Sequence, residues 1–310
     1  MISVLMCIYN EKQIWVKDAI SSILNQTYQD FEIIIIVDNP NLPEELKLYL
    51  DCIVVNDLRI KIYFNEINLG LAMSLNKGLK YASGNYIARM DADDISMPER
   101  FQREIEYLEK TGKDLVSCQR INIFEDGTEM DVVMHLSDNP NKELPYSNFI
   151  VHPGVMVRTK VIKALHGYRN FYMSQDYDLW LRMIASGYDI GVLEDVLLKY
   201  RVRKNGISEK NKLEQYYISE YQKKLYKERL RSGKDSFSEG NLKAYLCKKK
   251  ITLKKNYFYI LSRREVDHAI KDFKTRDIRF LFPLAKAFIY YPEIPVKTIW
   301  SICKMKISLF

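Results

Sequence analysis

The sequence predicts an α/β protein with a mostly parallel, doubly wound sheet, followed by a helical C-terminal extension. Short apolar runs alternate with segments of helical periodicity through the first hundred of the 310 residues. This alternation is typical of a parallel sheet that is covered by helices. Residues 33–37 are five consecutive β-branched residues, the pattern of a strand buried on both faces.

The individual elements follow from hydrophobic periodicity and from the residues that bound each run. Strands are predicted over residues 3–8, 33–37, 60–64 and 86–90, and helices over 14–24, 43–50 and 71–81. A further helix is expected to open at Met97-Pro98-Glu99, because Pro and acidic residues suit a first turn. Beyond Thr111 we predict strands over 115–124, 130–134 and 154–158, a loop over 138–147 and a helix beginning near Asp176.

The composition is that of a folded globular chain, with 47% hydrophobic and 28% charged residues. Its five cysteines are scattered, with no close pair and no CxxC, so we expect neither a disulfide framework nor a zinc site. A reducing, cytoplasmic compartment fits this cysteine usage. The apolar N-terminus lacks a basic leader and is interpreted as a strand rather than a signal peptide. No apolar run reaches the ~18 residues that a membrane span needs.

The net charge of +7 conceals an uneven distribution. Residues 211–310 hold 23 Lys and Arg against 10 Asp and Glu, whereas the first 210 residues hold 24 against 30. We therefore predict a first domain over residues 1–210 and a basic, mainly helical region over 211–310.

Three carboxylates, those of Asp91, Asp93 and Asp94, directly follow the strand predicted over residues 86–90. Carboxylates this close repel one another and need a counter-charge. A hard divalent cation, Mn²⁺ or Mg²⁺, takes oxygen ligands and often shares them with substrate phosphates. The alternative is an acidic loop that only caps the following helix.

Open α/β sheets place ligands at the carboxyl ends of their strands. The expected site therefore combines residues 7–11, 38–40, 65–70 and 91–94. No GxGxxG follows the first strand and no GxxxxGK[ST] occurs, which disfavours dinucleotide cofactors and ordinary NTPase or kinase chemistry.

Four stretches together resemble the family 2 glycosyltransferases of the GT-A fold, which are inverting enzymes that use nucleotide sugars. The stretches occur in the family's order and at its spacing over residues 1–210, and they are SVLMCIYNE, ISSILNQTYQDFEIIIIVD, NLGLAMSLNKGLKYASGNYIARMDADD and QDYDLWLR. The resemblance implies a UDP-sugar donor, a divalent metal and a single displacement that converts an α-linked donor into a β-glycoside.

The resemblance also assigns nucleotide contacts. Asp38 matches the residue that holds the uracil of UDP, Tyr9 resembles the residue stacked beside the base, and Asn68 and Gly70 match the segment near the ribose and diphosphate. The family commonly has two adjacent Asp followed by Gly-Ser at the second strand. Here the first Asp is replaced by Val37 and the Gly-Ser by Asn39-Pro40, so the turn is altered.

For the metal, the resemblance makes Asp93 the preferred ligand and Asp91 a contact to the ribose or to metal-bound water, with Asp94 behind them. Arg89 is either a counter-charge to the diphosphate or a structural arginine. Arg203 stands where many members have the His of an Arg-x-His motif. A guanidinium has no lone pair for a metal, but it suits a diphosphate.

Asp176 matches the catalytic base of a motif usually written Glu-Asp, in which the Glu is Gln175 here. A carboxylate at a helix start that faces a cleft can act as a general base, although it can also simply cap the helix. Trp180 resembles an aromatic residue near the sugar pocket, but at helical spacing it is more often a core residue. His152-Pro153 resembles an acceptor-side loop.

The C-terminal region carries a predicted amphipathic helix. On a helix starting near Val296, one face holds Val296, Ile299, Trp300, Cys303, Ile307 and Phe310, with Lys297, Lys304 and Lys306 on the flanks. Such a helix fits an anionic membrane surface, and the alternative is packing on the catalytic body or on a second subunit. Nothing resembles a nucleic-acid recognition module.

These features lead to one hypothesis and two alternatives. We expect transfer of a hexose, galactose or glucose, from a UDP-sugar to a polyprenyl diphosphate-linked saccharide at the inner face of the cell membrane, in O-antigen or capsule assembly. A nucleotidyltransferase would need a Gly-rich basic loop after the first strand, and residues 8–13 do not supply one. A membrane-bound scaffold with a dead site would turn Asp93 or Asp176 away from a common cleft.

Overall fold

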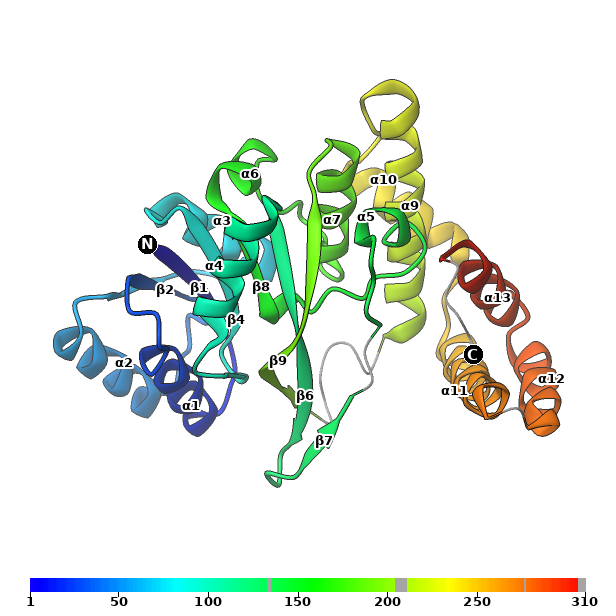
Figure 1. Ribbon diagram of the computed structural model, residues 1–310, viewed down its shortest axis with the longest axis horizontal. Helices are drawn as coiled ribbons and strands as arrows, with labels where there is room; N and C mark the ends of the chain where they lie inside the picture. Colours follow the sequence, from blue (N-terminus) through cyan, green and yellow to red (C-terminus); the bar gives the residue numbers. More distant parts are fainter. Residues whose placement is uncertain (133–134, 204–210, 276, 306–310) are drawn as a thin grey trace. The chain divides into compact units, whose positions relative to one another are not determined.

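The computed structural model describes residues 1–132, 135–203, 211–275 and 277–305 (Figure 1). The described chain forms two compact units, and each is considered by itself. The first comprises Met1–Asn141 and Phe149–Arg203, and the second comprises Lys142–Asn148 and the described residues that follow residue 210. The first unit holds a nine-stranded sheet in the order β3-β2-β1-β4-β8-β6-β9-β5, with β7 paired to β6.

Four parallel strands form the N-terminal half of the sheet. They are β1 (Ile2–Ile8), β2 (Phe31–Val37), β3 (Ile60–Phe64) and β4 (Tyr86–Asp91), linked by α1 (Gln13–Leu24), α2 (Glu44–Asn56) and α3 (Leu71–Tyr81). The α/β class and the parallel arrangement predicted from the sequence are confirmed. The register places Cys7 beside Asp91 and Ile8 beside Val37, so the strands end at one edge.

The other half of the sheet is mixed. It contains β5 (Ile95–Ser96), β6 (Leu115–Phe124), β7 (Glu129–Asp131), β8 (Val155–Arg158) and the long β9 (Ile190–Val202). β8 is antiparallel to β4 and β6, β5 is antiparallel to β9, and β6 and β9 are parallel. The remaining helices of this unit are α4 (Arg100–Thr111), α5 (Pro140–Glu143, whose last two residues fall in the second unit), η1 (His152–Gly154), α6 (Thr159–Ala164) and α7 (Gln175–Ala185).

One predicted helix start is wrong. Residues 97–99 do not open a helix, because α4 begins at Arg100. The carbonyl oxygens that would have started the helix accept other hydrogen bonds: Met97 O accepts from Gln26 Nε2 at 2.7 Å, and Pro98 O accepts from Thr27 N at 2.8 Å. The predicted strand over residues 130–134 is also shifted, because β7 covers Glu129–Asp131, and residues 133 and 134 lie outside the described part.

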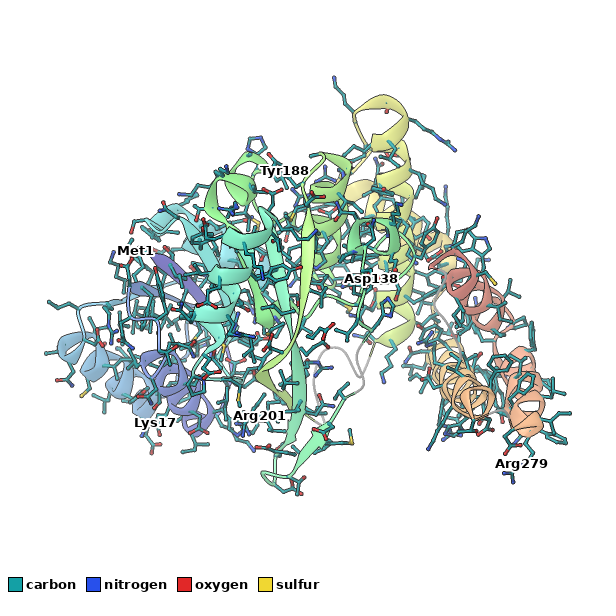
Figure 2. The ribbon with its side chains drawn as sticks, viewed as in Figure 1. Met1, Lys17, Asp138, Tyr188, Arg201 and Arg279 are labelled. Carbon is teal, nitrogen blue, oxygen red and sulfur yellow. The ribbon has the colours of Figure 1, made fainter. Side chains whose placement is uncertain are left out.

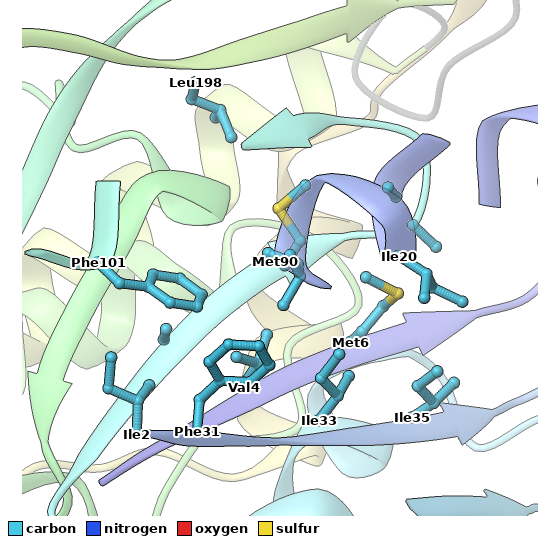
Figure 3. Packing of buried hydrophobic residues seen from close by; sticks show 14 of the residues in the cluster. Ile2, Val4, Met6, Ile20, Phe31, Ile33, Ile35, Met90, Phe101 and Leu198 are labelled. Carbon is cyan, nitrogen blue, oxygen red and sulfur yellow. The ribbon is translucent and has the colours of Figure 1, made fainter. Parts of the chain in front are cut away.

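The core of this unit lies against both faces of the parallel strands. On one face Val4, Met6, Ile33 and Ile35 pack with buried residues of α1, α2 and α4 (Figure 3). On the other face α3 comes so close that a Cβ on Gly78 would lie 3.3 Å from Leu5 Cδ2. Every residue of β2 is buried, as its β-branched run predicts.

The second unit is mainly helical. It contains α9 (Lys212–Ser232), α10 (Glu239–Lys249), α11 (Leu253–Lys274), η2 (Ile278–Phe280), α12 (Leu281–Tyr290) and α13 (Glu293–Met305). Its own core is built by Leu213, Tyr217, Tyr259, Val266, Ala287 and Ile294. The segment Lys142–Asn148 belongs to it, with Tyr146 O accepting from Lys223 Nζ at 2.8 Å. In the described part of the chain, no helix combines the length and hydrophobicity required to cross a bilayer.

Gly84 offers a test of the packing around β4. A Cβ at this position would lie 2.6 Å from Ser3 N and 2.8 Å from Ile2 C, and backbone atoms cannot yield as a flexible side chain can. We expect Gly84→Ala to lower the free energy of unfolding by about 1–3 kcal/mol, measured by urea denaturation. Gly240→Ala in α10, where the nearest atom would be 3.8 Å away, is the matched control and should cause no loss.

Candidate active site

Arg89 and Asp91 form a buried ion pair at the carboxyl end of β4. Arg89 Nη2 lies 2.5 Å from Asp91 Oδ1, and the Arg89 side chain is 4% exposed whereas that of Asp91 is 32% exposed. The Nε and Nη1 atoms of Arg89 are buried without a hydrogen-bond partner. The guanidinium therefore has donor capacity that the described protein does not use.

Asp93 is paired with Arg203 in the same site. Arg203 Nε lies 2.5 Å from Asp93 Oδ2, and Arg203 Nη2 lies 3.1 Å from Glu11 Oε1. One guanidinium thus joins the residues that follow β1, β4 and β9. Glu11 belongs to the strand-end stretch that the sequence singled out, but its role as a partner of Arg203 was not predicted.

Arg201, labelled in Figure 2, fixes the turn between β4 and β5. Its Nε donates to Asp93 O at 2.7 Å, and its backbone N donates to Asp94 Oδ1 at 2.7 Å. Asp94 is 1% exposed and its Oδ2 has no hydrogen-bond partner. Asp94 is therefore buried behind the turn, and its role relative to a metal stays a prediction.

The crowded carboxylates are hard to ionise together. Burial, together with repulsion by Asp91, raises the pKa of Asp93 to about 7 although Arg203 opposes the shift. Burial and the charges of Asp91 and Asp93 raise the pKa of Asp94 well above its usual value. The site therefore carries more acidic character than its arginines neutralise, and it favours added positive charge.

Asp38 is buried, and its carboxylate is occupied by the chain itself. Its Oδ1 accepts from Asn65 Nδ2 at 2.7 Å and from Leu69 N at 2.8 Å, and its Oδ2 accepts from Gly70 N at 2.8 Å. Gly70, at a φ of +78°, also donates its N–H to Asn68 Oδ1 at 2.9 Å and precedes α3. Asp38 thus orders the loop that contains Asn68 and Gly70, and its contact with uracil stays a prediction.

Tyr9 lies at the exposed end of β1 and is 44% exposed. Its backbone N donates to Glu11 Oε2 at 2.7 Å, and its carbonyl oxygen accepts from Asn39 Nδ2 at 2.6 Å. The altered turn after β2 is therefore tied to the end of β1. The Tyr9 ring remains available to a ligand.

Asp176 is the second residue of α7 and is half-buried. Ser174, at a φ of +55°, turns the chain into this helix. Trp180, one helical turn further along, is 1% exposed, which matches the core alternative rather than an open sugar pocket.

Tyr168, which sequence reasoning missed, is a buried residue near the candidate site. Its hydroxyl lies 2.9 Å from His152 Nε2. Burial raises the pKa of the Tyr168 hydroxyl, with Arg89 opposing and Asp176 adding to the shift. Tyr168 is therefore within electrostatic reach of both Arg89 and Asp176. Burial and the Arg89 charge hold the pKa of His152 well below its usual range, so its ring is neutral at pH 7.

Side chains of two helices hold the backbone of residues 165–168. Asn76 of α3 accepts from Tyr168 N at 2.8 Å and donates to Tyr168 O at 2.7 Å. Arg182 of α7 donates to Leu165 O at 2.7 Å and to Gly167 O at 2.6 Å. The sequence offers only an indirect signal for these contacts. Asn76 and Arg182 lie within two of the stretches that resemble the family, residues 68–94 and 175–182.

The donor set fits a divalent cation in part. Asp91 and Asp93 supply carboxylate oxygens, the ligands that Mg²⁺ and Mn²⁺ prefer, and the buried Asp94 Oδ2 lacks a partner. Among the described residues, however, no three His, Cys, Asp or Glu side chains are grouped to hold a metal. A cation here would need further ligands from a substrate or water.

Comparison with known proteins identifies the family. Residues 3–165, more than half of the chain, match the family described as "Glycosyl transferase family 2". The chain belongs to glycosyltransferase family 2. The enzyme class that the sequence predicts is confirmed, and the nucleotidyltransferase alternative is not supported.

Several curated relatives cover much of this glycosyltransferase. An uncharacterised glycosyltransferase of Methanocaldococcus jannaschii is 39% identical over 70% of the chain and 77% of its own length. The O-antigen biosynthesis glycosyltransferase WbnJ of Escherichia coli is 35% identical over 71% of this chain and 87% of its own length. An E. coli UDP-Gal:alpha-D-GlcNAc-diphosphoundecaprenol beta-1,3-galactosyltransferase is 30% identical over 70% of this chain and 80% of its own length.

A solved structure supports the fold. S. aureus TarS in complex with UDP-GlcNAc superposes with a TM-score of 0.62 at 15% identity, over 96% of this chain and 91% of that one. At this identity the likeness concerns the fold alone, and it agrees with the GT-A architecture that the family resemblance implies.

The raised pKa of Asp93 predicts a pH-dependent stability. Its pKa is about 7 in the folded protein against an ordinary 3.8, so the folded state binds the proton more tightly. The contribution is fully present below pH 4 and is lost as the pH rises to 7. In chelator, Asp93→Asn should raise the melting temperature at pH 8 by roughly 2–4 °C, with little effect at pH 4.

Asp131→Asn, at an exposed carboxylate that ends β7, is the control and should change the melting temperature at neither pH. A lower melting temperature for Asp93→Asn at pH 8 would mean that the ion pair with Arg203 outweighs the cost of burial.

Proposed function

We propose that this glycosyltransferase transfers a hexose from a UDP-sugar to a hydroxyl of a lipid-linked glycan, with inversion, in assembly of a bacterial O-antigen or capsule. The observation that carries the proposal is the carboxylate and arginine cluster at the strand ends. The charges of Arg89 in this cluster and of Asp176 on α7 both act on the buried Tyr168. The relatives that are named for O-antigen synthesis and for transfer to a diphosphoundecaprenol acceptor support it. Galactose or glucose is the proposed sugar.

The nucleotide is proposed to bind at the ends of β1 and β2. Tyr9 offers an exposed ring on which a uracil can stack. The loop of Asn68 and Gly70, which Asp38 holds in place, is proposed to pass the ribose and diphosphate. One lone pair of the Asp38 carboxylate is left for a base N–H, because three of its four acceptor positions are used.

The diphosphate is proposed to lie over Asp91 and Asp93. Mn²⁺ or Mg²⁺ held by Asp93 and Asp91 would supply positive charge to the departing UDP. Arg89, which has two unused donors, and Arg203 carry fixed positive charge in the same place. Guanidinium groups suit phosphate oxygens because they offer paired N–H donors.

Asp176 is proposed as the general base. It accepts the proton of the acceptor hydroxyl while that oxygen attacks the anomeric carbon and the bond to UDP breaks. A single in-line displacement inverts the configuration, so an α-linked donor gives a β-glycoside. The neutral pair of Tyr168 and His152 helps to shape the pocket without adding charge.

An enzyme that uses a lipid-linked acceptor must reach that acceptor at a membrane surface. We therefore propose that this protein attaches peripherally to the inner face of the cell membrane. The outward face of α12 holds Leu281, Phe282, Ala285, Phe288 and Ile289, and the whole helix contains no acidic residue. Phe282 and Ile289 are 72% and 79% exposed. On α13 the predicted face of Val296, Ile299, Trp300 and Cys303 is likewise exposed, whereas residues 307 and 310 lie outside the described part.

The transfer reaction gives the first test. Asp176→Asn should lower kcat for transfer from UDP-galactose or UDP-glucose to a short-chain polyprenyl diphosphate-linked saccharide by roughly 10²–10⁴-fold, because it removes the proton acceptor. Its affinity for UDP should stay within about twofold of the wild type. NMR of the product should show the β-anomer.

Asp51→Asn, at an exposed carboxylate of α2, is the control and should keep the activity of the wild type. If Asp176→Asn is as active as the wild type, Asp176 is not the general base.

Vesicle sedimentation tests the membrane surface. Binding to phosphatidylglycerol-containing vesicles should exceed binding to phosphatidylcholine vesicles and weaken with salt. Replacing both Phe282 and Ile289 by Ser should weaken binding at least about tenfold, because two large side chains no longer enter the lipid. Leu58→Ser, at a site that is 92% exposed, is the matched control. Unchanged binding of the double variant would exclude α12 as the contact, and a concentration-dependent dimer would point to a second copy.

A further inference from the structure

Arg203 occupies the carboxylate that the proposed cation would use. Its Nε lies 2.5 Å from Asp93 Oδ2 and its Nη2 lies 3.1 Å from Glu11 Oε1. The guanidinium is therefore bound by two carboxylates, which come from two different strand ends.

The indole ring of Trp15 lies next to the guanidinium groups of Arg203 and Arg201. The ring of Trp15, which is 7% exposed, lies 5.9 Å from the guanidinium carbon of Arg203 and 5.1 Å from that of Arg201. A cation over an indole ring is attracted to it. The sequence analysis placed Trp15 only in the helix predicted over residues 14–24. The arginines near its ring are about 190 residues away in the chain, so the local sequence does not predict this contact.

Arg203 is more accessible to solvent than its two carboxylate partners. The Arg203 side chain is 30% exposed, whereas the side chains of Asp93 and Glu11 are 7% and 10% exposed. Of the three groups, the guanidinium is therefore the one most accessible to a ligand in solution.

We propose that Arg203 is a positioning residue that competes with a divalent cation for Asp93, and that the nucleotide diphosphate relieves this competition by offering the guanidinium new acceptors. The inference rests on the proposed UDP and metal site. A guanidinium that pairs with phosphate oxygens releases Asp93 to the cation. Cation and nucleotide then bind cooperatively, and the coupling must be reciprocal.

A different explanation of the same geometry is that Arg203 only contributes positive charge. Arg120 separates the two explanations. Its charge is close enough to Asp94 to interact with it, and its guanidinium lies 4.0 Å from the centroid of the Tyr200 ring, but it donates to Asn122 and forms no ion pair with any described carboxylate. Loss of Arg120 removes a nearby positive charge without freeing Asp93.

Titration calorimetry on the full chain, with Mn²⁺ as the probe, tests the proposal. Mn²⁺ alone should bind the wild type weakly. Saturating UDP should lower the Kd of Mn²⁺ at least tenfold, after correction for Mn²⁺ bound by free UDP, and Mn²⁺ should lower the Kd of UDP by the same factor. Arg203→Gln should bind Mn²⁺ alone at least fivefold more tightly than the wild type and show a smaller coupling with UDP. Arg120→Gln should leave the Kd of Mn²⁺ within about twofold.

The remaining outcomes overturn one claim or the other. Equal tightening in Arg203→Gln and Arg120→Gln, or none in either, means that Arg203 does not compete for Asp93. UDP binding that is indifferent to Mn²⁺ in the wild type also overturns the inference, and this measurement does not depend on any variant folding. Failure of the wild type to bind UDP at all, with or without Mn²⁺, instead overturns the proposed nucleotide site.

Discussion

Repulsion among carboxylates at the end of β4 is the constraint on which the active site depends. Asp91, Asp93 and Asp94 come within four residues of chain, and Glu11 joins them from the end of β1. Buried carboxylates are costly unless they are paired or hydrogen-bonded. Arg89 comes from β4 itself, whereas Arg201 at the end of β9 and Arg203 just after it come more than a hundred residues later.

The site is therefore completed by long-range strand pairing rather than by the motif alone. β9 pairs with β6 along most of its length and with β5 at Ile95 and Ser96. These pairings place Arg201 against the turn of Asp93 and Asp94 and bring Arg203 to Asp93. The same contacts that hold the turn also determine where the carboxylates point. Substitutions that relieve the repulsion are thus expected to trade binding for stability.

Local patterns explain how much of the fold the sequence predicts. The bounds of β3, α3 and β6 agree with the prediction to the residue, because each run has clear polar or glycine boundaries. The start of α4 was missed because Gln26 and Thr27, about 70 residues away, take the carbonyls of Met97 and Pro98. The irregular strand β9, with its register shifts against β6, has no simple two-residue alternation to detect.

In the candidate site, too, features that depend on neighbouring residues in the chain were predicted, and those that depend on distant residues were not. The sequence could group Arg89, Asp91 and Asp93, which the structure brings together, because they lie within five residues of the chain. Asp38 was assigned to a ligand, yet its carboxylate accepts three hydrogen bonds from its own protein, and residue type alone cannot distinguish these uses. Tyr168 was missed because its neighbours, Asn76 and His152, are 92 and 16 residues away.

Charged groups and neutral polar groups lie in different parts of this site. Around the proposed diphosphate position, carboxylates and arginines are already paired, so a nucleotide bound there, as proposed, would exchange ion-pair partners rather than enter an apolar pocket. Burial keeps the phenol of Tyr168 protonated, and burial with Arg89 keeps His152 uncharged. These neutral groups, which lie within electrostatic reach of both Arg89 and Asp176, add no charge to the site. If Asp176 is the base, as proposed, it can accept the proton of the acceptor hydroxyl while the arginines pair with the departing nucleotide.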